Sequence, residues 1–239
     1  MKIKQKIRAA IVFFMFLMFP IIINFLSPVL ILTGSSEGVI NGSFIVFIML
    51  FITSLFVGRA WCGWICPASG MQESCENFRE KKAKTGVGNI VRGAIWFVWV
   101  GMIIFMFIKA GQFKNVGLIY PNKSFIEMMG IQVLIVYLGV VIIVFIMTLI
   151  WSGRAFCKYL CWIAPFMIIG NKIRYWLKIP GLYIKPEKDN CINCGKCTKN
   201  CPMDINVENM VEKENMYNRE CILCLRCTDS CPKNAIATK

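Results

Sequence analysis

Two runs of cysteines near the end of the chain repeat one spacing. CINCGKCTKNCP begins at Cys191 and CILCLRCTDSCP at Cys221, and both read C-x2-C-x2-C-x3-C-P. In this pattern the three closely spaced thiolates hold one iron–sulfur cluster, and the fourth, before proline, holds the neighbouring one. We therefore predict two [4Fe-4S] clusters with crossed ligands. Cluster one would use Cys191, Cys194, Cys197 and Cys231, and cluster two would use Cys221, Cys224, Cys227 and Cys201.

A pair of structural zinc sites is the alternative for these runs. Zinc is usually held by two separated C-x2-C pairs, so a third evenly spaced cysteine followed by C-P fits it poorly. We expect residues 181–239 to form a small α+β, bacterial-type 2[4Fe-4S] ferredoxin domain that needs its metal to fold. Nearby apolar side chains would exclude water from the clusters: Ile192, Ile222, Leu223 and Leu225.

Four further cysteines belong to a second repeat. GRAWCGWIC at 58–66 aligns without a gap with GRAFCKYLC at 153–161, at a constant offset of 95 residues. Residues four apart on a helix face the same way, so each motif could present two thiolates from one short helical turn. A twofold relation between the repeats would bring the pairs face to face. The candidate ligands of such a third iron–sulfur cluster are Cys62, Cys66, Cys157 and Cys161.

Other readings of this repeat stay open. The cysteine pairs could form a thiol–disulfide relay, or could pack without metal. Arg59 and Arg154 could be ordinary interfacial anchors, which is the interpretation we favour from the sequence, or could offset the negative charge of a cluster. The aromatic residues of the motifs read as a membrane-interface belt: Trp61, Trp64, Phe156 and Trp162. Cys75 is left over and reads as a free thiol.

The elements that must position these motifs are apolar. The chain has 239 residues, 57% of them hydrophobic, with a mean hydropathy of +0.60, which is too apolar for an ordinary soluble domain. Four segments are long enough to cross a bilayer as helices: about 10–32, 39–57, 93–109 and 131–151. We read the first as a retained anchor kinked at Pro20. The prediction is an α-helical membrane protein with four transmembrane helices.

The basic residues predict its orientation. The formal charge is +14, and segments 1–8, 59–92 and 154–178 carry 15 Lys and Arg, against three (Lys109, Lys114 and Lys123) in the opposite connections. By the positive-inside rule, both termini and the ferredoxin domain are cytoplasmic in a multi-pass protein of the inner membrane. This distribution leaves no basic stripe for nucleic acid, so we expect none to bind.

Cysteine and histidine usage narrows the chemistry. Thirteen cysteines on the reducing side of a membrane favour metal ligation over disulfides. The absence of histidine excludes a histidine-ligated haem, a histidine base and any histidine-containing zinc site. The sequence also shows no Walker loop and no nicotinamide or flavin site.

The domain plan follows from the repeats. Residues 1–180 form a transmembrane domain with C-x3-C repeats at 58–67 and 153–165, and residues 181–239 form the ferredoxin domain. Each repeat has two spans and one motif, so the halves are parallel repeats and both motifs lie on the same membrane face as the ferredoxin domain.

The G-R-x-[aromatic]-C-x3-C motifs, combined with a double-cluster ferredoxin, resemble the NapH and NosR type of membrane polyferredoxin, also seen in the CcoG type. The resemblance covers nearly the whole chain, from the second apolar segment to Pro232. It implies an electron-transfer protein of anaerobic respiration that connects the quinone pool or soluble donors with a partner reductase. One departure is that Trp162 follows Cys161 where the family has proline, and proline comes only at Pro165.

We therefore expect a membrane-bound iron–sulfur protein that relays electrons between a quinone-pool or soluble donor and a partner oxidoreductase. Its expected partners are membrane lipid, an oxidoreductase or ferredoxin-like donor, and quinone. The alternatives are an enzyme in its own right, either a quinol dehydrogenase or a metal-ion reductase, and a non-catalytic redox sensor or assembly factor.

Overall fold

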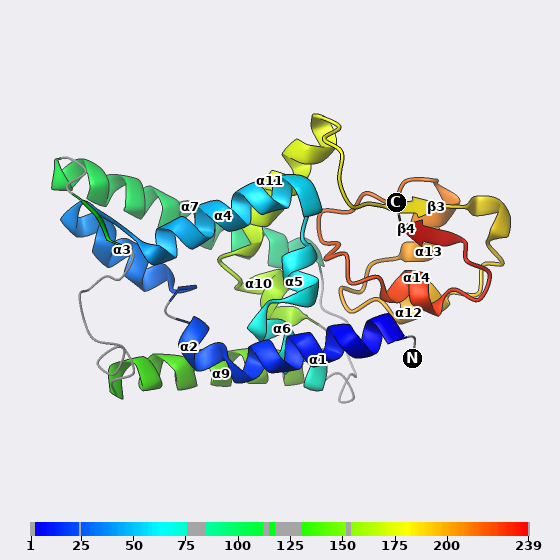
Figure 1. The fold of residues 1–239 in the computed structure, drawn as a ribbon, viewed down its shortest axis with the longest axis horizontal. Helices are drawn as coiled ribbons and strands as arrows, with labels where there is room; N and C mark the ends of the chain where they lie inside the picture. Colours follow the sequence, from blue (N-terminus) through cyan, green and yellow to red (C-terminus); the bar gives the residue numbers. More distant parts are fainter. Residues whose placement is uncertain are drawn as a thin grey trace.

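A computed structural model describes residues 3–23, 25–75, 85–111, 115–117, 131–151 and 154–238. Within them, the chain forms an elongated helical part and a small C-terminal part at one end of it (Figure 1). The first helix begins beside the C-terminal part. Lys114 and Lys123, used above to predict orientation, lie outside the described residues.

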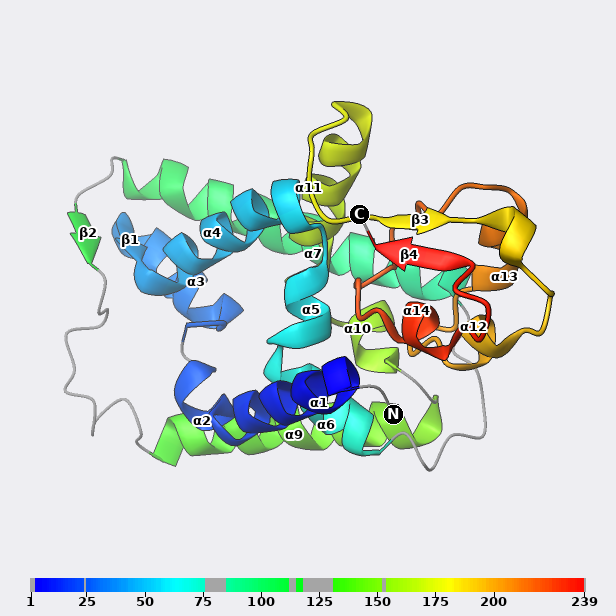
Figure 2. The same ribbon diagram turned by 45° about the vertical axis from the view of Figure 1, so that its right-hand side comes forward.

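The long helices of the helical part are α1 (Ile3–Leu17), α3 (Pro28–Glu37), α4 (Gly42–Val57), α7 (Thr85–Ala110), α9 (Ile131–Ile150) and α11 (Ala164–Trp176). The short elements between them are α2 (Phe19–Ile22), β1 (Val39–Asn41), α5 (Ala60–Trp64), α6 (Pro67–Ser74), β2 (Asn115–Gly117) and α10 (Ala155–Tyr159). β1 and β2 pair in parallel, with Ile40 opposite Val116, at the end far from the C-terminal part (Figure 2).

Four helices run lengthwise between the two ends of the helical part. α1 and α7 lead away from the C-terminal part, and α4 and α9 return toward it (Figures 1 and 2). Three of the predicted apolar segments, 39–57, 93–109 and 131–151, correspond to α4, α7 and α9. The cysteine motifs follow the two returning helices, so both lie at the end that carries the C-terminal part.

The first predicted segment, 10–32, is not one helix. The first lengthwise helix, α1, begins earlier, at Ile3, and ends at Leu17. Two separate helices, α2 and α3, follow it. Pro20 lies in the first turn of α2 and Pro28 in that of α3. Proline lacks an N–H and disfavours helical geometry in the preceding residue, so each proline starts a new helix instead of kinking an old one.

Length and composition identify fewer membrane-spanning helices than the four predicted. Among the described residues, the Gly88–Ala110 part of α7 is long and apolar enough to cross a bilayer. Gly42–Val57 and Leu134–Ile150 are apolar but shorter. Large apolar side chains nevertheless cover the outside of these helices: Phe97, Phe105 and Ile135 are 72%, 65% and 62% exposed.

Packing between the helices places the cysteine motifs. α4 packs on α11, α1 on α6, and α10 on both α7 and α9. The short helices α5 and α10 consequently lie between the lengthwise helices and the C-terminal part (Figure 2). The buried apolar cluster is continuous across this region, since it contains Met167 of α11 together with Met203 and Ile222 of the C-terminal part.

The C-terminal part is built around its two cysteine runs. Antiparallel strands β3 (Ile184–Pro186) and β4 (Ile236–Thr238) close it, and its short helices are α12 (Lys196–Lys199), α13 (Val207–Glu212) and α14 (Arg226–Ser230). α12 and α14 begin at the same position of each run. This α+β arrangement agrees with the predicted ferredoxin domain.

Candidate iron–sulfur sites

The cysteines of the C-terminal part divide between two cavities. Cys201, from the first run, lines one cavity together with Cys221, Cys224 and Cys227 from the second. The rest of its wall is apolar and comes from Ile184, Pro202, Met203, Ile205, Val207, Met210, Met216, Ile222 and Leu225. These four cysteines are the set assigned to cluster two from the spacing.

The other cavity holds the set assigned to cluster one. Cys191, Cys194, Cys197 and Cys231 line it together with Glu208, Lys233 and backbone of the first run. Its residues are the more exposed ones, since Cys194 is exposed and Ile192 is 58% exposed. Ile192 lines this cavity but covers it less completely than its counterpart Ile222, which is 1% exposed, covers the other.

The backbone of the two runs repeats as closely as the cysteines do. Asn193 and Leu223, each two residues after the first cysteine, have φ of 51° and 48°. Gly195 and Leu225, each four residues after it, have φ of 66° and 61°. A left-handed φ is energetically costly for leucine, and such backbone strain is typical of functional sites, where the surrounding structure holds it. Both runs thus form the same loop around their cavities.

The arrangement fits clusters better than single ions. Within the part of the chain that the structure describes, no three cysteine, aspartate or glutamate side chains converge closely enough to hold one metal ion. A four-iron cluster spreads its thiolates around a cube, so a cysteine-lined cavity is the form its site takes. The chemistry of the donor set, all thiolates, also suits iron–sulfur clusters.

The two C-x3-C motifs fold alike. α5 carries Cys62 and α10 carries Cys157, and each helix ends two residues before the second cysteine. The amide of Cys66 then donates to the carbonyl of Trp61 at 3.0 Å. The amide of Cys161 donates to the carbonyl of Phe156 at the same distance.

This geometry corrects the expected position of the second cysteine and shows what the missing proline changes in the second motif. The two cysteines of a motif do not share a helical turn, because the second one lies beyond the helix end. In the first motif, Pro67 requires extended backbone at Cys66, which has ψ of 123°. The second motif makes the same turn without that proline, with φ and ψ of −122° and −18° at Leu160 against −123° and −27° at Ile65. The departure from the family pattern therefore leaves the turn intact.

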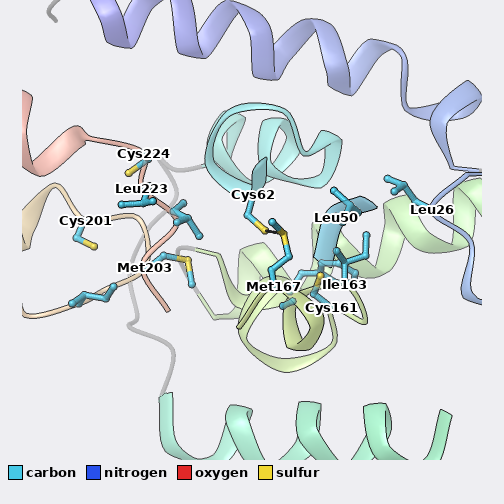
Figure 3. Packing of buried hydrophobic residues seen from close by; sticks show 14 of the residues in the cluster. Leu26, Leu50, Cys62, Cys161, Ile163, Met167, Cys201, Met203, Leu223 and Cys224 are labelled. Carbon is cyan, nitrogen blue, oxygen red and sulfur yellow. Dashed lines mark hydrogen bonds between the residues drawn. The ribbon is translucent and has the colours of Figure 1, made fainter. Parts of the chain in front are cut away.

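The structure brings the four thiols of the repeats into one buried region. All four are at most 9% exposed. Burial raises the pKa of Cys66, and the neighbouring thiols of Cys62, Cys157 and Cys161 raise it further. Figure 3 shows Cys62 and Cys161 approaching Met167 from different segments, and 3.4 Å separates Cys62 Sγ from Met167 Sδ.

Ionisation of these thiols is unfavourable unless a cation binds them. Burial, followed by the charges of Cys157 and Cys62, raises the pKa of Cys161 to about 12. Burial likewise raises the pKa of Cys62 and of Cys66, so metal binding would release the protons of these thiols. Amides at the start of the following helices face the sulfurs and favour the thiolate, from Ser69 toward Cys66 and from Ile163 and Ala164 toward Cys161.

Arg59 and Arg154 are not interfacial anchors, which corrects the interpretation favoured from the sequence. Arg59 is 0% and Arg154 1% exposed. Arg59 Nε and Nη2 and Arg154 Nε are buried without a hydrogen-bond partner among the described residues. Although burial opposes it, the neighbouring Cys62, Glu220 and Cys157 raise the pKa of Arg59. Unused donors beside the cysteines fit an anionic cluster.

Two carboxylates fix these arginines, one largely buried and one fully buried. Glu73, in α6, accepts from both Nη atoms of Arg8 at 2.8 Å, from Arg226 Nη2 at 3.2 Å, and from Arg154. Burial opposes ionisation of Glu73, but Arg154, Arg8 and Arg226 hold its pKa below the usual value. One carboxylate therefore joins the N-terminal helix, both repeats and the C-terminal part.

Glu220 forms the second junction. It accepts from Arg59 Nη1 at 3.0 Å and from Arg92 Nη2 at 2.7 Å. Burial opposes its ionisation, yet hydrogen bonds and charge from Arg92 and Arg59 lower its pKa to about 2. Arg92 Nη1 also donates to the carbonyl oxygen of Cys157 at 2.9 Å. The C-terminal part is thus tied to both motifs by buried ion pairs.

Sequence reasoning missed most of this network. No local pattern marks Glu73, Arg92 or Glu220, and Arg8 reads only as part of a basic flank. The ion pairs that join them to other segments connect residues 65 to 161 positions apart along the chain. The one signal in the sequence is its composition, because the chain has few acidic residues to pair with its many basic ones.

The motif aromatics have specific partners. Trp64 Nε1 donates to the carbonyl of Leu223 at 3.0 Å, and Trp162 Nε1 donates to that of Leu26 at 2.9 Å. Phe156 is 4% exposed and stacks edge-on with Trp162. These aromatic side chains shield the thiols and join different segments of the chain, in addition to their predicted place in a membrane-interface belt. Cys75 lies partly exposed after α6.

Comparison with known families assigns iron–sulfur binding to both regions. A family model described as a 4Fe-4S binding domain matches residues 42–85 and 133–180, which contain the two C-x3-C motifs. A second model, described as a 4Fe-4S dicluster domain, matches residues 190–236.

Named relatives agree with this class. YccM of Escherichia coli (strain K12), provisionally named an electron transport protein, is 23% identical over 196 residues, which are 76% of this chain and 52% of YccM. MauN of Methylorubrum extorquens, named a methylamine utilization ferredoxin-type protein, is 28% identical over 148 residues, 60% of this chain and 47% of MauN. The uncharacterized protein MJ0750 of Methanocaldococcus jannaschii is 27% identical and covers 70% of this chain and 68% of its own.

The chain spans about half the length of YccM and of MauN. No solved structure matches it. The matched domains and the names of the relatives together support an iron–sulfur electron-transfer protein.

Proposed function

We propose that this chain is a four-span membrane protein that relays electrons through three [4Fe-4S] clusters, one of them shared by the two C-x3-C repeats. The observation that carries this proposal is the burial of four thiols from both repeats beside arginines with unused donors. When bound, iron–sulfur clusters supply sites that gain and lose single electrons. The membrane polyferredoxin type of NapH and NosR is the finer class we propose, with the domains divided near residue 180.

The protein's residues perform three tasks in this relay. The cysteines of each set hold the clusters, in the crossed arrangement for the C-terminal pair. Arg59 and Arg154 offset the negative charge of a thiolate-bound cluster close to hydrocarbon, where an uncompensated charge is costly. Phe156, Trp64 and Trp162 restrict the access of water to the membrane-edge site.

The exposure of the cysteines in the two cavities predicts the order in which the clusters pass electrons. The cavity of Cys221, Cys224 and Cys227 lies against the helical part, since Ile222 and Leu223 join its buried cluster. In the other cavity, Cys194 is exposed to solvent. We therefore place cluster two in the middle of the relay and cluster one at the exchange point with a soluble oxidoreductase or ferredoxin-like donor. A donor or acceptor of the quinone pool would act at the membrane side.

The membrane assignment rests on the apolar exterior and the basic residues. The exposed Phe97, Phe105 and Ile135 require an apolar surrounding. α4 has 16 residues, so at 1.5 Å per residue it is about 24 Å long, a few Å short of a hydrocarbon core of about 30 Å. Bilayers accommodate such a mismatch by local thinning. The excess of Lys and Arg at the ferredoxin end favours a cytoplasmic position for that end.

Anaerobic purification of the tagged full chain in mild detergent tests this function. The relay predicts that an oxidoreductase co-purifies, and that clusters reduced with dithionite in the partner-free chain are reoxidised when this oxidoreductase and its oxidised substrate are added. It also predicts that the partner-free chain does not catalyse steady-state oxidation of a quinol or reduction of a ferric chelate. Steady-state turnover by the chain without a partner would instead make the chain an enzyme.

A further inference from the structure

The first repeat touches the loop of cluster two through its backbone. Gly63, the residue after Cys62, lies so close to this loop that a Cβ atom would overlap the carbonyl oxygen of Ile222. The same atom would lie 3.4 Å from the backbone N and Cα of Cys224. Any side chain at position 63 would force the two segments apart, because only glycine permits this backbone approach. A predicted ligand of the membrane-edge site is therefore one residue from a close backbone approach to the loop that carries Cys224.

Hydrogen bonds hold this contact from both sides. Trp64 Nε1 donates to the carbonyl of Leu223 at 3.0 Å, and Arg8 Nη1 donates to the carbonyl of Gly63 at 2.9 Å. Gly63 and Arg8 are buried. Since these bonds replace solvent around the backbone, the contact is dry and fixed in place.

The second repeat makes no equivalent backbone contact through its corresponding residue. The residue 95 positions after Gly63 is Lys158. Its Nζ pairs with Asp204 at 2.9 Å, and the amide of Asp204 donates to the carbonyl of Cys201 at 3.1 Å. The second repeat thus reaches the other side of cluster two through a long side chain. The two repeats share a fold but differ in how closely their cysteines approach the C-terminal part.

We propose that the Cys62–Gly63 segment is the electron-transfer contact between the membrane-edge site and cluster two, and that Gly63 is a positioning residue for this step. The inference rests on the proposed function, in which both cysteine sets hold clusters. The path from Cys62 to Cys224 needs one through-space step, where the backbone of Gly63 closely approaches that of Ile222. Electron tunnelling weakens exponentially with separation, so this contact favours the first repeat over the second.

The step is a one-electron exchange. One side of the contact is oxidised by one electron and the other is reduced by one. No bond forms or breaks, and no proton moves. Dithionite serves as the reductant in the experiment below.

The test compares Gly63→Ala with wild type and with Gly101→Ala, whose added Cβ meets nothing within 4 Å. All are purified anaerobically as full chains, and iron and sulfide are counted. Electron paramagnetic resonance of the dithionite-reduced proteins then measures the magnetic broadening between neighbouring clusters. Hydrogen exchange of the 221–225 amides reports the backbone contact independently of the metal. We expect Gly63→Ala to keep its iron, lose broadening and exchange faster at 221–225, while Gly101→Ala matches wild type.

The outcomes separate the two proposals. Wild type without membrane-edge iron would refute the proposed function and not the contact. Full iron content with unchanged broadening in Gly63→Ala would overturn the inference. If Gly63→Ala fails to assemble, Trp64→Phe replaces it, because phenylalanine keeps a ring but lacks the N–H that binds Leu223. A partial loss of broadening is then expected, and unchanged broadening would refute the contact.

Discussion

Arg154 donates a hydrogen bond to the carbonyl oxygen of Cys62, with 2.7 Å between Nη1 and the oxygen. The arginine belongs to the second repeat and the cysteine to the first. The same guanidinium pairs with Glu73, which follows the first repeat in α6. The two motifs are therefore bound to each other, as a site shared by both repeats requires.

Arg154→Lys should weaken this bond between the repeats. Lysine keeps the charge but lacks the planar fork that reaches two acceptors at once. A buried carbonyl or carboxylate left without its donor costs about 1–3 kcal/mol. We expect a lower thermal midpoint in detergent and less iron per chain. Arg219→Lys is the matched control, since the Arg219 side chain is 58% exposed, and equal losses in both variants would contradict the role of Arg154.

Glu73→Gln should be more damaging, because it leaves three arginines without their shared carboxylate. Removing one partner of a buried ion pair typically costs about 3–5 kcal/mol. The expected readout is a lower midpoint of chemical unfolding, together with easier proteolytic release of the C-terminal part. Glu212→Gln, at an exposed position, should leave both unchanged.

The contribution of Glu73 should not vary with pH in the neutral range. Its folded-state pKa is lowered, so its stabilisation is fully present above the unfolded value of about 4.3 and is lost as the pH falls through the folded value. The difference in unfolding free energy between wild type and Glu73→Gln should stay constant from about pH 8 to about pH 5. A difference that shrinks across this range would show that Glu73 is not held ionised.

Local spacing accounts for what could be predicted. Each cysteine run has its characteristic spacing within 12 residues, and the structure gathers each crossed set around one cavity. The apolar segments that form α4, α7 and α9 could also be predicted from the sequence. The first apolar segment was misplaced because Pro20 and Pro28 end helices there, and apolar length alone does not show which proline kinks a helix and which one stops it.

Tertiary pairing accounts for what could not be predicted. Arg59 looks like an anchor when only its apolar neighbours in sequence are read. Its partner Glu220 comes 161 positions later, and only the docking of the C-terminal part buries both. The second cysteine of each motif was placed on a helix because a spacing of four is helical, whereas the chain turns one residue before it.

The crossed ligation predicts opposite effects for two similar substitutions. Cys201→Ser should remove the buried cluster two, and Cys231→Ser the exposed cluster one. An iron chelator added to each reduced protein distinguishes them, because the exposed cluster should be lost first. If Cys201→Ser removes the chelator-sensitive cluster, the crossed assignment is wrong.

The proposed orientation can be tested with reporters. A reporter fused after Lys239 should be active only in the cytoplasm, and one inserted near Lys114, which lies outside the described residues, only on the opposite side. Cys75 should react with a membrane-impermeant thiol reagent from the cytoplasmic side alone. Labelling of Cys75 from outside would invert the topology.

The most direct measurement of the central claim is the iron and sulfide content of the full chain, prepared anaerobically. Three four-iron clusters correspond to about 12 irons per chain, whereas the C-terminal pair alone corresponds to about 8. We predict the higher value for wild type and for Cys75→Ser, and the lower one for Cys62→Ser and for Cys157→Ser, because each removes one ligand of a site shared by both repeats. A wild-type protein with about 8 irons, or a Cys62→Ser variant that keeps the wild-type content, would contradict the shared cluster.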